Sequence, residues 1–249
     1  MNIIVDNLAV RYVDMGHEHA PVVLFLHGWG VEATTFQNLI TELIGGYRLI
    51  ALDLPGFGQS ERPHTAWGVG DYARFVQGFL LKIKVAPNFI VGHSFGGRIA
   101  IKMVSQNLAS PRKLVLISSA GINLPTTLKR KVLKVVLKAG KALTAVPPLR
   151  PVRSTLQRLT ASQDYLTAGP LRETFLKIIR EDLRQDATRI AIPTLLIWGE
   201  KDTTTPPKEG EILHQHITGS QLVIIPGTGH FPYREAQAEV LRLLKSFFV

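Results

Sequence analysis

The chain has 249 residues, which is enough for one large domain with a sizeable core. Cysteine is absent, which excludes a disulfide framework and thiolate ligation of a metal. The formal net charge is +10, and residues 122–163 carry nine basic side chains and no acidic one. No apolar run approaches the roughly 18 residues of a membrane span, and the first residues lack a signal-peptide pattern, so we expect a soluble cytoplasmic protein.

Strands and helices alternate in the first part of the chain. Residues 3–5 and 8–12 predict two short strands around a turn at Asp6 and Asn7. Residues 22–26 form a continuous apolar run, which is typical of a strand buried on both faces. The pattern then predicts a helix over 35–44 that ends at two glycines, a strand over 47–54 and a helix over 71–83.

The most informative stretch covers residues 88–100. It begins with an apolar run typical of a buried strand, and a helical pattern starts at Arg98. Between them, Gly92, Ser94 and Gly96 form the pattern G-x-S-x-G. Between a strand and a helix, this pattern is the nucleophile elbow, a sharp turn that exposes a serine hydroxyl. The two glycines are expected because the strained serine backbone brings strand and helix close together.

The alternation stops after Gly121 and resumes at Thr194. Residues 122–188 read as helices interrupted by prolines. The later elements are a strand over 113–118 before the interruption and, after it, a strand over 194–198, a helix over 210–217, a strand over 221–225 and a helix over 235–248. This pattern predicts an α/β fold, with a mostly parallel central sheet and helices on both faces. We therefore expect a core of residues 1–121 and 189–249 and an inserted helical lid of residues 122–188 at the carboxyl ends of the strands.

Two groups with catalytic potential follow the last two strands. Asp202 comes after the strand 194–198, and His230 comes after the strand 221–225. A serine hydroxyl needs a general base, which is itself oriented by a third group. Glu200 competes with Asp202 for the role of the acid, although the spacing after the strand favours Asp202.

Five motifs carry a family resemblance. They are L-H-G-W-G (26–30), L-D-L-P-G-F-G-Q-S (52–60), G-H-S-F-G-G (92–97), W-G-E-K-D (198–202) and G-T-G-H-F-P (227–232). With them the chain resembles the α/β-hydrolase superfamily, in its lidded branch of serine esterases, cofactor-free haloperoxidases and C–C bond hydrolases. The chain order of nucleophile, acid and histidine is also that of the superfamily.

The resemblance implies a catalytic triad and an oxyanion hole. Ser94 would attack the substrate carbonyl, His230 would transfer the proton, and Asp202 would orient the imidazole. The backbone N–H groups of Trp29 and Phe95 would form the oxyanion hole. No cofactor or metal is implied.

Three further polar residues of the motifs are expected to support the site. His27 would support the oxyanion loop, and Asp53 would brace a neighbouring loop. His93, which precedes the nucleophile, would point away from the substrate.

A serine at the elbow suits acyl chemistry. The expected function is hydrolysis of a carboxylic ester or related small-molecule acyl substrate through an acyl-serine intermediate. One alternative is a C–C bond hydrolase or lyase acting on a dienoic keto acid, although these enzymes usually carry Asn where this chain has His93. A third possibility is a receptor-like binding protein that retains the triad.

Six of the nine basic residues in 122–163 fall on a predicted basic amphipathic helix at residues 128–143. One stripe of this helix carries the basic residues Arg130, Lys134, Lys138 and Lys141. Its basic face is either the solvated outside of the lid or an attractor for an anionic substrate, an acyl carrier protein or an anionic membrane surface. No nucleic-acid partner is expected, because aromatic residues are scarce and no recognition motif is present.

Overall fold

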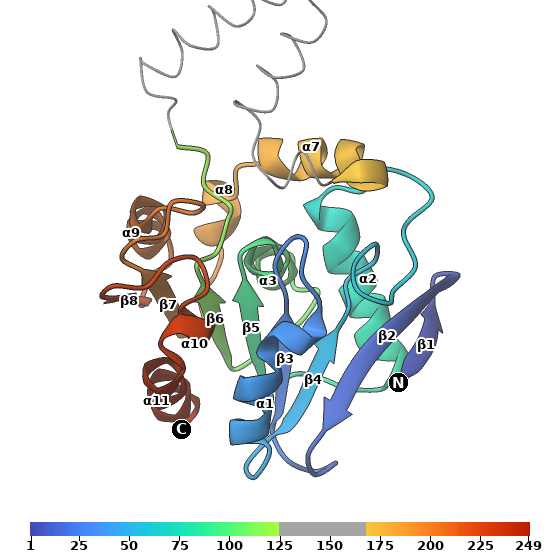
Figure 1. Cartoon of the computed structure of the whole chain (residues 1–249), viewed down its shortest axis with the longest axis horizontal. Helices are drawn as coiled ribbons and strands as arrows, with labels where there is room; N and C mark the ends of the chain where they lie inside the picture. Colours follow the sequence, from blue (N-terminus) through green and yellow to red (C-terminus); the bar gives the residue numbers. More distant parts are fainter. Residues whose placement is uncertain (125–167) are drawn as a thin grey trace, which may run out of the picture.

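The computed structural model describes residues 1–124 and 168–249 (Figure 1). Within these residues, eight strands form a single sheet in the order β1-β2-β4-β3-β5-β6-β7-β8. The strands are β1 (Asn2–Val5), β2 (Leu8–Met15), β3 (Val22–Leu26), β4 (Arg48–Leu52), β5 (Phe89–His93), β6 (Lys113–Ile117), β7 (Thr194–Gly199) and β8 (Gln221–Ile225). The six strands from β3 to β8 pair in parallel. At the other edge, β1 pairs antiparallel with β2, and β2 pairs antiparallel with β4. The predicted, mostly parallel sheet is confirmed.

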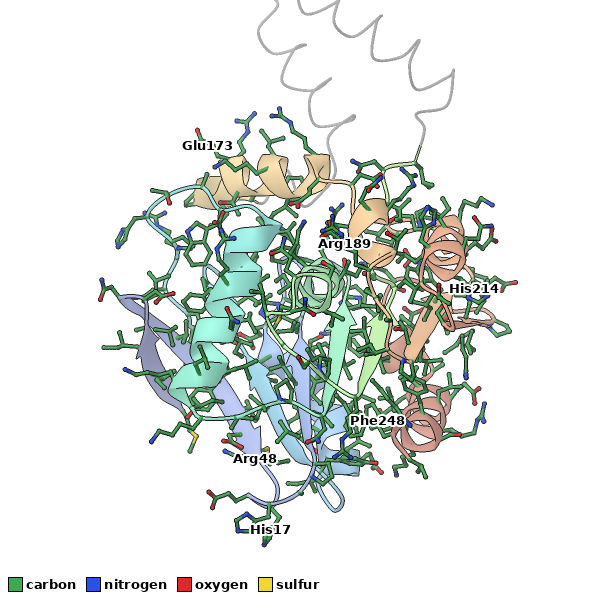
Figure 2. The ribbon with its side chains drawn as sticks, turned by 180° about the vertical axis from the view of Figure 1, so that it is seen from behind. His17, Arg48, Glu173, Arg189, His214 and Phe248 are labelled. Atoms are coloured by element: carbon green, nitrogen blue, oxygen red, sulfur yellow. The ribbon has the colours of Figure 1, made fainter. Side chains whose placement is uncertain are left out.

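Helices cover both faces of the sheet, also as predicted. One face packs against α2 (Val69–Lys82), α3 (Phe95–Ser105) and α9 (Pro207–His216). The other face packs against α1 (Gln37–Leu43) and α11 (Gln237–Phe248). The front view and the view from behind show these two sets on opposite sides of the sheet (Figure 1, Figure 2).

The short apolar strands lie where the sequence places them. The strands at 22–26 and 221–225 match the prediction to the residue. Asp6 and Asn7 both have positive φ, 47° and 62°, which is the backbone of a tight hairpin turn between β1 and β2. None of the helices in the described part of the chain is long and apolar enough to cross a membrane.

Several helix boundaries differ from the predictions. A 3-10 turn (η1, Ala33–Phe36) precedes α1, and α9 begins at Pro207 rather than at 210, since proline suits the first turn of a helix. The predicted helix over 235–248 corresponds to α11, which begins at Gln237, and a separate short helix, α10 (Pro232–Glu235), precedes it. Ala236 breaks the helix with φ −134° and ψ 53°. The Glu235 carboxylate turns back to accept the N–H groups of Gly229 and Phe231, at 2.7 and 3.1 Å, which ties α10 to the preceding loop.

Between β6 and β7 the chain leaves the sheet and returns through a short 3-10 turn (η3, Gly169–Leu171), α7 (Arg172–Arg180) and α8 (Arg184–Ala187). In Figure 1, α7 lies beyond the carboxyl ends of the parallel strands, at the top of the view. The predicted basic helix at 128–143 and most of the predicted lid fall in residues 125–167, outside the described residues. The division at 122 and 188 therefore stays a prediction.

Candidate active site

Ser94 occupies a strained turn between β5 and α3. Its φ is 50° and its ψ is −109°, a backbone conformation that residues with a Cβ rarely adopt. Its backbone N–H donates to the Ile117 carbonyl at 3.1 Å, which fixes the turn to the neighbouring strand β6. The residue is 8% exposed, and its hydroxyl reaches a cavity at the carboxyl end of the sheet. The strand, the strained serine and the helix are the predicted elbow.

The glycines around Ser94 are required by close backbone contacts. A Cβ on Gly92 would lie 2.6 Å from the Gly96 carbonyl oxygen. A Cβ on Gly96 would overlap the Leu26 carbonyl oxygen, and one on Gly97 would overlap the Ser119 hydroxyl. The elbow therefore packs its own backbone against β3, which only glycine permits.

Asp202 and His230 lie on adjacent loops after β7 and β8. The Lys201 N–H donates to the Thr228 carbonyl at 2.8 Å, and a Cβ on Gly199 would overlap the Gly229 carbonyl, so the two loops are held in close contact. Glu200, the alternative acid, is exposed and accepts the Gly227 N–H at 2.9 Å. Glu200 therefore stabilises the loop that carries His230, and the carboxylate next to the imidazole is that of Asp202.

Ser94, His230 and Asp202 form one hydrogen-bonded series. The Ser94 hydroxyl oxygen lies 3.1 Å from His230 Nε2. On the other side of the ring, His230 Nδ1 lies 2.8 Å from Asp202 Oδ2. With the proton on Nδ1 donated to the carboxylate, Nε2 has its lone pair toward the serine hydroxyl, which is the tautomer that a general base needs.

Groups other than His230 also hold the Asp202 carboxylate. Its Oδ1 accepts the N–H groups of Thr204 and Thr205, at 2.9 and 3.0 Å, and its Oδ2 lies 2.9 Å from the Thr205 hydroxyl. Burial raises the pKa of Asp202, but the hydrogen bond and charge of His230 and the bonds from Thr205 outweigh it, so the pKa lies below its usual value. The carboxylate is thus kept charged and fixed beside the imidazole.

The two residues predicted to form the oxyanion hole, Trp29 and Phe95, line the same cavity as the serine. Their backbone N–H groups donate to no other described residue. Phe95 is the first residue of α3, so its N–H belongs to the positive end of the helix dipole. The Trp29 indole packs against Phe57 and Phe175, with ring centroids 4.8 and 5.0 Å apart, which fixes the loop that carries its N–H. Both groups are available to an oxyanion.

His27 and Asp53 brace the loops beside these donors. His27 Nδ1 donates to the Gly28 carbonyl at 2.7 Å, and its Nε2 accepts the Leu54 N–H at 2.9 Å. Burial lowers the pKa of His27 to about 4, so it is neutral in this role. Asp53 accepts the Ala33 N–H at 2.8 Å. Neither side chain lines the cavity, which agrees with the supporting roles predicted for them.

His93 lies behind His230 and does not line the cavity. Its Nε2 donates to the His230 carbonyl at 2.9 Å, and its ring stands 4.9 Å from the His230 ring. Its Nδ1 has no hydrogen-bond partner among the described residues. Burial, together with the nearby His230, lowers the pKa of His93 to about 3. His93 is therefore a neutral packing and hydrogen-bonding support for the loop of His230.

The cavity next to Ser94 has a volume of about 520 Å³. Its apolar wall includes Trp29, Phe95 and the α7 residues Phe175 and Ile178. Its polar wall includes Arg98, Glu209 and the threonines at 203–205. A pocket with an apolar wall and a few convergent polar groups is typical of a small-molecule site.

Sequence reasoning did not identify Thr205, Arg98 or Glu209 as site residues. Thr205 follows Asp202 at i+3, and its role depends on a turn that the sequence does not announce. Arg98 is one helical turn after Ser94, but only the return of the chain through α7 brings the other cavity wall to it. Within the described ranges, no three His, Asp or Glu side chains converge as a metal site would require.

Several known proteins are similar to this chain over most of its length. The chain is 29% identical over 245 residues to the pimeloyl-[acyl-carrier protein] methyl ester esterase of Neisseria meningitidis, a match that covers 91% of this chain and 92% of the relative. It is 28% identical over 256 residues to lipase 1 of Psychrobacter immobilis, with 95% of this chain and 79% of the relative covered. The fold is similar to the crystal structure of a membrane phospholipase A described as a bacterial virulence factor. The TM-score is 0.80 and the identity is 26%, with 99% of this chain and 84% of that chain covered.

The family model of the alpha/beta hydrolases matches residues 23–243. This range contains the elbow, both later loops and the parallel part of the sheet except for the first residue of β3. The chain belongs to the alpha/beta hydrolase family.

Proposed function

We propose that this hydrolase is a serine esterase that cleaves a carboxylic ester, or a closely related acyl substrate, through an acyl-serine intermediate. The observation that carries the proposal is the hydrogen-bonded series from the Ser94 hydroxyl through His230 to Asp202, at 3.1 and 2.8 Å. The esterase and lipase among its relatives support the same chemistry.

In the first half of the reaction, the Ser94 oxygen attacks the carbonyl carbon while its proton passes to His230 Nε2. The π-electron pair of the carbonyl moves onto its oxygen, and the N–H groups of Trp29 and Phe95 stabilise that negative charge. When the tetrahedral intermediate collapses, the bond to the alkoxy oxygen breaks. The leaving alcohol takes the proton from His230, which leaves an acyl-serine.

In the second half, water attacks the acyl-serine. His230 Nε2 takes a proton from the water as its oxygen bonds to the carbonyl carbon, and then returns the proton to the departing Ser94 oxygen. The products are a carboxylic acid and the free enzyme. Throughout, Asp202 stays ionised and stabilises the transient imidazolium.

The test is hydrolysis of p-nitrophenyl esters from acetate to decanoate by the wild type and by Ser94→Ala. We expect saturable turnover that falls by roughly 10³-fold or more in the variant. Ser105→Ala is the matched control, since Ser105 lies on the same helix and its hydroxyl bonds to Asp186 at 2.9 Å, away from the cavity. A fluorophosphonate probe should label the wild type and the control but not Ser94→Ala.

Two other outcomes would contradict the esterase proposal. Absence of turnover on every ester, together with an unreactive Ser94, would overturn it as a whole. Slow single-turnover hydrolysis with tight retention of the ligand would favour a receptor that keeps the triad.

The charge of the chain adds a proposal about the carrier of the substrate. One relative acts, by its name, on an ester bound to acyl carrier protein. The basic residues concentrated at 122–163 are suited to attract such an acidic partner through their summed field. We propose an anionic carrier or substrate for this segment, most of which lies outside the described residues.

A further inference from the structure

Arg98 is a buried cation in the wall of the candidate active site. It stands one helical turn after Ser94 on α3, lines the same cavity and is only 6% exposed. Its Nη1 donates to the carbonyl oxygens of Ile178 and Glu181 at 3.0 and 2.8 Å, near the end of α7. No described residue accepts a hydrogen bond from its Nε or Nη2. One edge of the guanidinium is thus used by the protein, and the other remains available.

The carboxylates near Arg98 are committed to other partners. Glu181 pairs with Lys102 at 2.8 Å, and Asp182 pairs with Arg184 at 2.6 Å. Within the described part of the chain, no carboxylate forms an ion pair with Arg98. Arg98 is therefore a buried cation held by carbonyl oxygens rather than by an ion pair, and its place in a cavity wall indicates a binding function.

Glu209 is the one carboxylate among the described residues that line this cavity. It is 8% exposed, and the Ile122 backbone N–H hydrogen-bonds to it. Burial raises the pKa of Glu209 to about 7, although the charge of Arg98 acts in the opposite direction. Near neutral pH, part of the population carries a protonated Glu209, which leaves the positive charge of Arg98 uncancelled in the cavity.

We propose that Arg98 determines specificity by binding a carboxylate on the acyl group of the substrate, so that the preferred substrates are half-esters of dicarboxylic acids. This inference rests on the proposed esterase function. The free edge of Arg98 presents Nε–H and one Nη2–H in parallel, which is the arrangement that binds a carboxylate with two hydrogen bonds. Because Arg98 and Ser94 line one cavity, the ester and the carboxylate of one molecule can be held at the same time.

The test compares two substrates that differ only at the far end of the acyl chain. Monomethyl glutarate carries the carboxylate, and methyl glutaramate carries a neutral amide of nearly the same shape. We expect the wild type to hydrolyse the half-ester with a kcat/KM about 10- to 150-fold above that of the amide, the range for hydrogen bonds to a charged group. Half-esters from malonate to adipate then locate the best distance between the two ends.

Variants separate recognition from structural support. Arg98→Met should bring the ratio of the two kcat/KM values close to one, and Arg98→Lys should retain part of it, because the charge stays while the two-pronged geometry is lost. Lys102→Met is the control, since Lys102 contacts the same returning segment from the next turn of α3 but does not line the cavity. It should leave the ratio unchanged.

The ratio distinguishes the proposal from a purely structural role. If Arg98 only secures α7, Arg98→Met will lower both kcat/KM values by the same factor, which would overturn the proposal. A wild type without preference for the half-ester would overturn it too.

A binding measurement does not depend on turnover. Calorimetry of monomethyl glutarate with Ser94→Ala should show binding that is absent for methyl glutaramate. Equal binding of both compounds would contradict the role of Arg98, whereas selective binding without turnover by the wild type would contradict only the esterase function.

Discussion

At the scale of single residues, the candidate site depends on positions where a side chain larger than hydrogen cannot fit. Gly96 is the clearest case, because its Cα faces the Leu26 carbonyl oxygen of β3 at a distance that leaves no space for a Cβ. Ser94, two residues earlier, keeps its φ of 50° because β5 and α3 hold it from both sides. The strain at the serine and the absence of a side chain at Gly96 are two aspects of one contact.

Gly96→Ala is therefore expected to reduce stability severely. The added methyl overlaps backbone rather than a flexible side chain, so the cost should be about 3 kcal/mol or more in the free energy of unfolding. Urea denaturation provides the measurement. Gly45→Ala is the matched control, since nothing lies within 4 Å of its Cβ position, and it should change stability by less than about 1 kcal/mol. Equal effects of the two substitutions would contradict the packing argument.

The two buried histidines should make the protein sensitive to acid. Burial lowers the pKa of His93 to about 3 and that of His27 to about 4, while both titrate near 6.5 in the unfolded chain. Below pH 6.5 the unfolded state therefore binds protons that the folded state does not. The stability due to the neutral rings is complete above pH 6.5 and is lost as the pH falls toward 3, by at most about 1.4 kcal/mol per pH unit for each ring.

His93→Asn removes one of these groups. The free energy of unfolding, measured at pH 7, 6 and 5, should fall less steeply with acid in this variant than in the wild type. His214→Asn serves as the control, because His214 is exposed on α9 at the periphery of the molecule (Figure 2). A slope in His93→Asn that equals that of the wild type would show that His93 is not the neutral, buried group described above.

At the scale of elements, one stripe of α3 secures the chain where it returns from the insertion. Lys102 pairs with Glu181 at 2.8 Å and with Asp186 at 2.9 Å, and the Ser105 hydroxyl donates to Asp186 at 2.9 Å. Arg98 adds its two bonds to the end of α7. The same helix thus follows directly after Ser94, the proposed nucleophile, and holds the opposite wall of the cavity along its length.

Lys102→Met should cost roughly 3 kcal/mol in the free energy of unfolding, because it leaves Asp186 buried without its cation. The exposed pair of Lys208 and Glu211 offers a comparison, and Lys208→Met should cost about 0.5 kcal/mol or less. Thermal or urea unfolding of both variants decides the matter. Similar small losses in the two would mean that the Lys102 cluster is as weak as a surface pair.

Elements with a strong local signal could be predicted from sequence, and elements set by distant contacts could not. The strand at 22–26 is a continuous apolar run, and the run alone fixes its ends. The break at Ala236 depends on the Glu235 carboxylate turning back to Gly229, so the helical pattern of the C-terminus did not reveal it. Local composition determines the ends of the strand, and tertiary hydrogen bonds determine the break between the two C-terminal helices.

The candidate site divides in the same way. Ser94, Asp202 and His230 each follow a recognisable strand, so motifs and chain order were enough to predict them. Thr205 and Arg98 gain their roles only when separate segments meet. Thr205 contacts the Ser118 carbonyl at 2.9 Å, and Arg98 contacts Ile178, 80 positions along the chain. No spacing in the sequence encodes these contacts.

At the scale of the whole molecule, the uneven charge predicts how the enzyme responds to salt. The kcat/KM for an ester carried by an acidic acyl carrier protein should fall steeply between about 0.05 and 0.5 M salt, since salt screens the attraction to the basic segment. A small neutral ester should be hydrolysed at nearly constant kcat/KM over this range. Replacing Lys134, Lys138 and Lys141 by Glu should remove the difference, and a salt response equal for both substrates would contradict a carrier partner.

The two ends of the insertion meet at the core. The Leu183 N–H donates to the Gly121 carbonyl at 2.8 Å, and the Asn123 side-chain amide donates to the Arg180 carbonyl at 3.0 Å. The core therefore holds both ends of this segment, and the cost of loop closure changes by only about 0.6 kcal/mol for each doubling of loop length. The chain between position 124 and the start of α7 should thus accept other lengths at little cost in stability, whereas α7 has to stay, because its Phe175 packs on Trp29 beside Ser94.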